Sequence, residues 1–150
     1  MSKYQHVLVA IDVTEEAGEV LAKAQQAAAD AGAELTAVTI VRPLTHAYTG
    51  MEVAGLAAAA VNFEAEAKAS VEKSLGELCE QHGIDAAHRH VRFGVPANEI
   101  KQCAEEFGAD LIVVGSHGRH GLGLLLGSTA NAVLHGAGCD ILTVRVHDPE

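Results

Sequence analysis

The chain has 150 residues, of which 49% are hydrophobic, 20% are charged and 3% are aromatic, and its formal net charge at pH 7 is −10. This length and balance fit a single globular domain, residues 1–150, and exclude a disordered chain. The negative charge and the scarcity of aromatic rings argue against a nucleic-acid partner. No apolar run approaches the roughly 20 residues of a membrane span, so we expect no membrane insertion.

The N-terminal sequence and the cysteine pattern indicate the cellular compartment of the protein. The opening MSKYQHVLVAID lacks the plan of a signal peptide, because its apolar run is short and no cleavage site follows. Cys79, Cys103 and Cys139 are widely spaced and form no CxxC pair. That spacing matches neither a disulfide framework nor a zinc site, so we interpret all three as small buried hydrophobes. We therefore expect a cytoplasmic protein.

The first part of the chain predicts a strand, a helix and a second strand. Residues 4–11 are an apolar run rich in valine, typical of a strand. A helix over residues 15–31 follows, which Thr14 caps and Gly32 ends. Residues 35–41 predict the second strand.

The middle of the chain predicts a loop, a long helix and an edge strand. Residues 45–55 contain turn formers without a period and predict a loop. Residues 56–83 are rich in alanine and glutamate and carry one apolar face, which predicts a helix. Residues 87–93 alternate weakly and predict an edge strand, on which we expect His88 and His90 to be polar and exposed.

The last part completes the alternation. Pro96 marks the start of a helix that runs through Phe107. Residues 110–115 are a continuous apolar strand of the kind that is covered on both faces, residues 128–135 predict a short helix, and residues 139–146 predict the last strand. Repeated strand–helix alternation indicates a single-domain α/β fold, an open five-stranded parallel sheet with helices on both faces.

A glycine-rich segment, GSHGRHGLGLLLGST over residues 115–129, follows the fourth strand. Its backbone amides and the start of the next helix suit a phosphate. In such a sheet, ligands bind at the carboxyl ends of strands where the strand order reverses. If the first and fourth strands are neighbours, Asp12 faces the same crevice and can accept hydrogen bonds from a ribose. The phosphate-binding candidates are Gly115, Gly118, Gly127, Ser128 and Thr129, with Arg119 adding a positive charge.

Two other kinds of site are weaker interpretations. His117, His120 and His135 are three imidazoles near this segment, but a glycine loop fixes no ring direction, so we favour a phosphate-facing role for His117 over a metal site. Residues 115–129 contain no carboxylate, which leaves a histidine as the local base. We therefore expect a binder without catalytic residues or a metal, and not an enzyme.

The stretches IDVTEEA, DLIVVGSHGRHGLGLLLGSTANAVLH and CDILTVRV resemble the universal stress protein family, and the universal stress protein A type in particular. The resemblance implies a Rossmann-like sheet in the order 3-2-1-4-5, similar to the adenine nucleotide alpha hydrolases. It also implies a homodimer joined through the last strand, here between Leu142 and Val146. Some members of the family bind ATP.

In those members, a glycine is followed by two residues, a glycine, nine residues, a glycine and then Ser or Thr. Here only eight residues separate Gly118 from Gly127, as in the branch of the family that does not visibly bind ATP, although the glycines remain. The resemblance places Asp12 on the ribose and the backbone around Ile40 on the adenine. The leading hypothesis is a homodimeric stress-response binder of ATP, AMP or a relative. The alternatives are a ligand-free module that contacts an unknown protein partner, and a slow ATPase.

Overall fold

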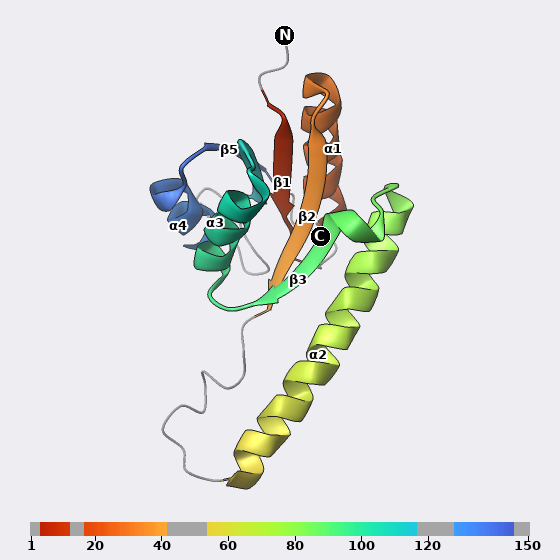
Figure 1. The fold of residues 1–150 in the computed structure, drawn as a ribbon, viewed down its shortest axis with the longest axis vertical. Coiled ribbons are helices and arrows are strands. Elements are labelled where there is room, and N and C mark those ends of the chain that lie inside the picture. Colours follow the sequence, from red (N-terminus) through yellow and green to blue (C-terminus); the bar gives the residue numbers. More distant parts are fainter. Residues whose placement is uncertain (1–3, 13–16, 42–53, 117–127, 146–150) are drawn as a thin grey trace.

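The computed structural model of the protein describes residues 4–12, 17–41, 54–116 and 128–145. They form a parallel five-stranded sheet in the order β3-β2-β1-β4-β5 (Figure 1). The strands are β1 (His6–Ala10), β2 (Glu34–Val41), β3 (Arg89–Phe93), β4 (Leu111–Gly115) and β5 (Asp140–Val144). The predicted fold class and strand order are thus confirmed.

The helices lie between the strands as the alternation predicted. They are α1 (Ala17–Ala31), α2 (Ala54–Gln81), the 3-10 turn η2 (Ala86–His88), α3 (Pro96–Phe107) and α4 (Ser128–Gly136). Thr14, residues 45–53 of the predicted loop and Val146 lie outside the described residues.

Several predicted boundaries differ from the structure by one or two residues, and two of these differences have a clear physical reason. The helix α2 already begins at Ala54, inside the predicted loop, because alanine is the strongest helix former and the sequence from there is rich in it. The predicted third strand began at residue 87, but η2 occupies residues 86–88 and β3 starts at Arg89. The backbone N–H of His88 donates to the carbonyl of Asp85 at 3.1 Å, which closes this turn before the strand.

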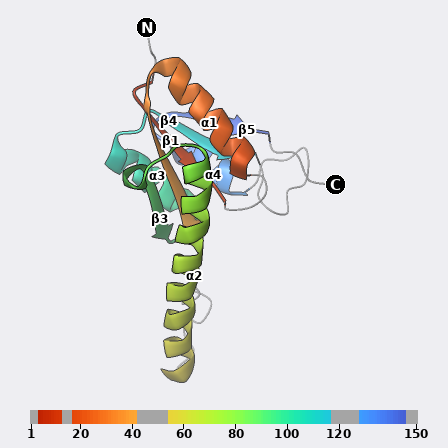
Figure 2. The ribbon, with the colours of Figure 1, turned by 90° about the vertical axis from the view of Figure 1, so that its right-hand side faces the viewer.

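The helices cover the sheet in two pairs, α1 with α2 on one face and α3 with α4 on the other (Figures 1 and 2). Successive side chains of β1 point to opposite faces of the sheet. Val7 and Val9 pack against α1, while Leu8 packs against α3 and α4. Leu75 and Cys79 anchor the C-terminal part of α2, and its N-terminal part extends away from the sheet (Figure 2). Within the described residues, no helix is both long and apolar enough for a membrane crossing.

Asp110 joins the beginnings of the two central strands. Its backbone N–H donates to the carbonyl of His6 at 3.0 Å. Its carboxylate accepts hydrogen bonds from the backbone N–H groups of Gln5 at 2.9 Å and His6 at 3.0 Å. One side chain therefore fixes the start of β1 relative to the start of β4.

The edge strand β3 is less exposed than the sequence predicted. All five of its residues are half-buried, because α2 packs on the face that carries Val91 and the end of α3 covers the other face. The ring of His90 stacks on that of Phe107 with centroids 4.9 Å apart, and Arg92 forms an ion pair with Glu106. The prediction that this strand is simply polar and exposed is therefore wrong.

The cysteines are free thiols, as predicted. Cys79 and Cys103 are buried, whereas Cys139 is half-buried. The interpretation as buried hydrophobes is thus confirmed for two of the three.

Candidate functional site

The carboxyl ends of β1 and β4 lie side by side. The two strands pair from Val7 opposite Leu111 to Val9 opposite Val113, so the same register continued places Gly115 next to Ile11. Since β2 flanks β1 on its other side, the strand order reverses between β1 and β4. Asp12, the residue after Ile11, therefore reaches the point where open α/β sheets bind their ligands.

The end of β1 is held by its neighbour β2. The backbone N–H of Ile11 donates to the carbonyl of Val38 at 2.9 Å, and the Thr39 hydroxyl donates to the carbonyl of Ile11 at 2.5 Å. Thr39 is buried, whereas Asp12, the residue that follows Ile11, is exposed. Both backbone polar groups of Ile11, the residue before Asp12, are thus hydrogen-bonded to β2. Sequence reasoning missed Thr39, whose signal is a hydroxyl residue in an otherwise apolar strand.

Ile40 lies at the same edge of the sheet as Asp12. It is half-buried on β2, two residues beyond Val38, which pairs with Ala10 of β1. Asp12, Ile40 and Gly115 therefore converge from three adjacent strands. The structure brings together these three sequence-predicted residues.

The chain beyond β4 begins at the same edge. Gly115 pairs with Val144 of β5, and the backbone N–H of Ser116 donates to the Val144 carbonyl at 2.7 Å. His117, Gly118, Arg119 and Gly127 lie outside the described residues, as does His120.

The helix α4 begins at Ser128, where the glycine-rich segment ends. Thr129 is half-buried in its first turn, while Ala130 and Val133 are buried against the sheet face that α3 also covers. The first amides of a helix have no partner within it and carry a partial positive charge. The described residues thus supply a carboxylate just after β1 and, separately, backbone amides and the Thr129 hydroxyl in the first turn of α4.

A pocket that the sequence did not reveal lies between α1 and the end of β5. It has a volume of about 390 Å³, and Lys23 and Arg145 are among the residues that line it. Within the described ranges, no group of three His, Cys, Asp or Glu side chains is arranged to hold a metal ion. Glu19 also lines this pocket, so its charged groups are two basic side chains and one acidic side chain.

Comparison with known proteins identifies the family. The sequence model of the universal stress protein family matches residues 3–145. The chain belongs to the universal stress protein family. It is 39% identical over 141 residues to universal stress protein A homolog 1 of Coxiella burnetii, an alignment that covers 94% of this chain and 96% of that protein. The resemblance seen in the sequence is therefore confirmed.

Solved structures agree with the fold of this family member. A universal stress protein in complex with cAMP is 25% identical, with a TM-score of 0.68 over 96% of this chain and 98% of that one. The hypothetical protein MJ0577 is 18% identical and superposes with a TM-score of 0.78 over 97% and 99% of the two chains. At that identity the second likeness concerns the fold alone.

Proposed function

We propose that this family member is a stress-response protein that binds an adenine nucleotide at the edge where β1 and β4 end. The observation that carries the proposal is the convergence of Asp12, Ile40 and Gly115 at the reversal of strand order. The solved relative in complex with cAMP supports an adenine nucleotide as the ligand class. ATP, AMP and their relatives are the candidates.

In the proposed binding mode, each part of the nucleotide has its own partner. The Asp12 carboxylate accepts hydrogen bonds from the ribose hydroxyls, and the backbone around Ile40 faces the adenine. The phosphates meet amides and hydroxyls at the start of α4. The residues proposed for the phosphates are Gly115, His117, Gly118, Arg119, Gly127, Ser128 and Thr129.

We propose binding without rapid turnover, in the cytoplasm. Residues 115–129 contain no carboxylate that would hold a metal ion or act as a base beside the outer phosphate. A slow ATPase remains the rival hypothesis at this site. This hypothesis predicts that the protein releases phosphate from ATP faster than background and that His117→Ala or Arg119→Ala abolishes this release.

The last strand offers a surface for the proposed homodimer. β5 is an edge strand of the described sheet, and the side chain of Leu142 on it is 39% exposed. Pairing two copies along β5 would remove both the open strand edge and this apolar surface from water. Light scattering after gel filtration tests this, with Leu142→Asp expected to give monomers. The matched control Val95→Asp changes a residue that is 45% exposed away from β5 and should leave the dimer intact.

Nucleotide binding is tested by thermal shift on the full chain with ATP, ADP, AMP and cAMP. A ligand that binds only the folded state stabilises it by RT ln(1 + [L]/Kd), which is about 4 kcal/mol at a thousand-fold excess over Kd. For a chain of this size, that corresponds to a rise in Tm of about 8–16 °C. Asp12→Ala should remove most of the shift, whereas Asp30→Ala, at the opposite end of α1, should not.

The absence of any shift with all four nucleotides would reject the proposal. That result would favour the ligand-free interaction module. The observation in its favour is that only eight residues, instead of nine, separate Gly118 from Gly127. The module predicts a dimer whose partner binding is unchanged by Asp12→Ala.

A further inference from the structure

A second pocket lies at the opposite end of the sheet from the nucleotide crevice. It has a volume of about 380 Å³, within the range of small-molecule sites, and opens between the end of α1, the start of β2 and the segment after α2. Ala28, Leu35 and Ile84 give it apolar surface, and Ala28 and Ile84 are buried. Its apolar part suits the carbon chain of a small ligand.

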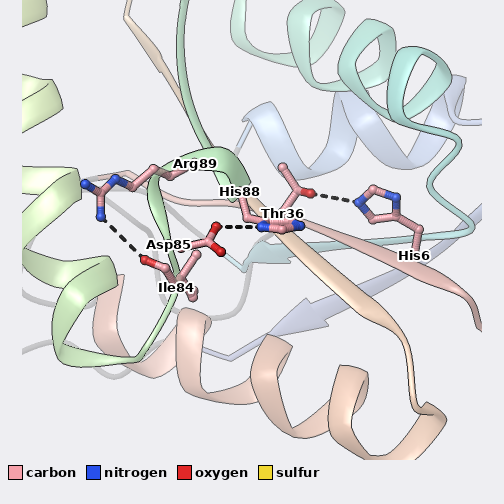
Figure 3. Close-up of polar contacts among 6 residues, drawn as sticks. All are labelled: His6, Thr36, Ile84, Asp85, His88 and Arg89. Carbon is pink, nitrogen blue, oxygen red and sulfur yellow. Dashed lines mark hydrogen bonds and ion pairs between the residues drawn. The ribbon is translucent and has the colours of Figure 1, made fainter.

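The polar side of this pocket is acidic. Glu34 and Asp85 are exposed carboxylates among its lining residues. The Nδ1 atom of His88 donates to Oδ1 of Asp85 at 2.6 Å (Figure 3), and this hydrogen bond lowers the pKa of Asp85 below its usual range. Asp85 is therefore ionised at neutral pH.

The walls of the pocket are tied together before any ligand arrives. The Gln25 side chain of α1 donates through Nε2 to the carbonyl of His82 at 2.6 Å. Its Oε1 atom accepts from Nδ1 of the same histidine at 2.8 Å. This reciprocal pair links α1 to the segment after α2, so little ordering is required on binding.

The surrounding helices add negative potential. Both α1 and α2 end beside this pocket, at Ala31 and Gln81, and neither carries a basic residue in its last turn. The terminal carbonyls of a helix carry a partial negative charge, which attracts cations. No lysine or arginine is among the residues that line the pocket.

The nearby Arg89 is engaged elsewhere. Its guanidinium lies 3.4 Å from the carbonyl of Ile84 (Figure 3) and 3.5 Å from that of Gly76. It also faces the Glu80 carboxylate at 3.7 Å. The carboxylates of the pocket are therefore not neutralised by this cation.

We propose that the pocket binds a small aliphatic diamine, whose ammonium groups contact Glu34 and Asp85 while its methylene chain packs on Ala28, Leu35 and Ile84. A metal ion is not the ligand we infer, because within the described residues no three His, Cys, Asp or Glu side chains are grouped to coordinate one. An ammonium group needs only acceptors on an exposed surface, and the carboxylates of Glu34 and Asp85 supply them. This site is separate from the nucleotide crevice and does not depend on it.

The test is an NMR titration of the full chain with 1,4-diaminobutane at low ionic strength, with 1,4-butanediol as the uncharged analogue. We expect saturable amide shifts at Gly83, Asp85 and Glu34 with the diamine and none with the diol. Loss of one exposed charge pair should weaken binding about two- to five-fold, so Glu34→Gln and Asp85→Asn should each raise Kd by that factor. The control Glu105→Gln removes an equal charge from an exposed position on α3 and should leave Kd unchanged.

Three results would overturn the proposal. The first is an equal response to the diol, which would mean that charge is not recognised. The second is a set of shifts spread over the acidic surface without saturation. The third is an equal loss of affinity in Glu105→Gln. If one pocket variant fails to fold, the other decides the question together with a salt series, since added salt should weaken a genuine ammonium–carboxylate contact.

Discussion

Replacing Asp110 by alanine should destabilise the protein at the junction of its two central strands. The carboxylate accepts two backbone hydrogen bonds, from the N–H groups of Gln5 and His6. The substitution deletes both acceptors while leaving both donors in place. Hydrogen bonds to a charged group contribute about 1.5–3 kcal/mol each when buried. Because Asp110 is only half-buried and water can reach the freed donors, we expect about 1 kcal/mol per bond.

The total loss is then about 2 kcal/mol, which for this chain length lowers Tm by about 4–8 °C. The pH dependence gives an independent check. Partial burial raises the pKa of Asp110, but the backbone N–H groups of Gln5, His6 and Asp110 itself, with the charge interaction with His6, together lower it more, so its net pKa in the folded protein is below the usual value. A depressed pKa stabilises the folded state above the unfolded pKa, near 3.9, and that stability is lost as pH falls through the folded pKa.

The measurement is urea unfolding of the wild type and of Asp110→Ala over a series of pH values. The difference in free energy of unfolding should be constant near neutral pH and shrink below about pH 4. The control Asp30→Ala removes an exposed carboxylate whose side-chain bond is to Gln26, and should change stability little. A difference between wild type and Asp110→Ala that is near zero at pH 7, or that grows on acidification, would refute this account of the junction.

Three further predictions concern the core, a helix end and the thiols. Leu8→Ala should lower the free energy of unfolding in urea by about 3–5 kcal/mol, because Leu8 is fully buried. The control Val95→Ala should lower it by less than about 0.5 kcal/mol, and similar losses in the two variants would contradict the packing described. Gly108→Ala should cost about 1 kcal/mol in the same assay, since Gly108 has φ = 66° at the end of α3; a gain in stability would be inconsistent with this. Cys139 should react with a thiol reagent well before Cys103, because burial raises the pKa of Cys103 to about 11. Mass spectrometry of the labelled native protein should show this order of modification, and the reverse order would contradict the prediction.

Much of the fold follows from the local pattern of the sequence. Each strand is an apolar or alternating run, and glycine or proline marks most helix ends, so the elements were predictable one by one. The order of the strands depends on contacts between segments far apart in the chain, and here it came from the resemblance to a family. The start of α2 was misplaced although its alanine-rich sequence is a local signal, whereas the exposure of β3 was misjudged because a distant residue, Phe107 of α3, covers its histidine.

The candidate nucleotide site was predictable in part. Asp12 and Gly115 each follow a recognisable strand, and parallel neighbours necessarily end at one edge. Thr39 escaped detection because its hydroxyl serves the backbone of another strand, which no local pattern records. The acidic pocket beside Asp85 was unpredictable for the same reason, since Glu34 and Asp85 come to line one pocket only after α2 has returned the chain to the start of β2.

The placement of β1 in the middle of the sheet has a consequence for synthesis. Its partner β4 follows about 104 positions later, the separation between His6 and Asp110. At roughly 5–20 residues per second, a ribosome takes on the order of 5–20 s to cover that distance. During this interval β1 can pair with β2 while its other edge waits unpaired, so the nascent chain exposes an apolar strand edge that invites aggregation or capture by a chaperone.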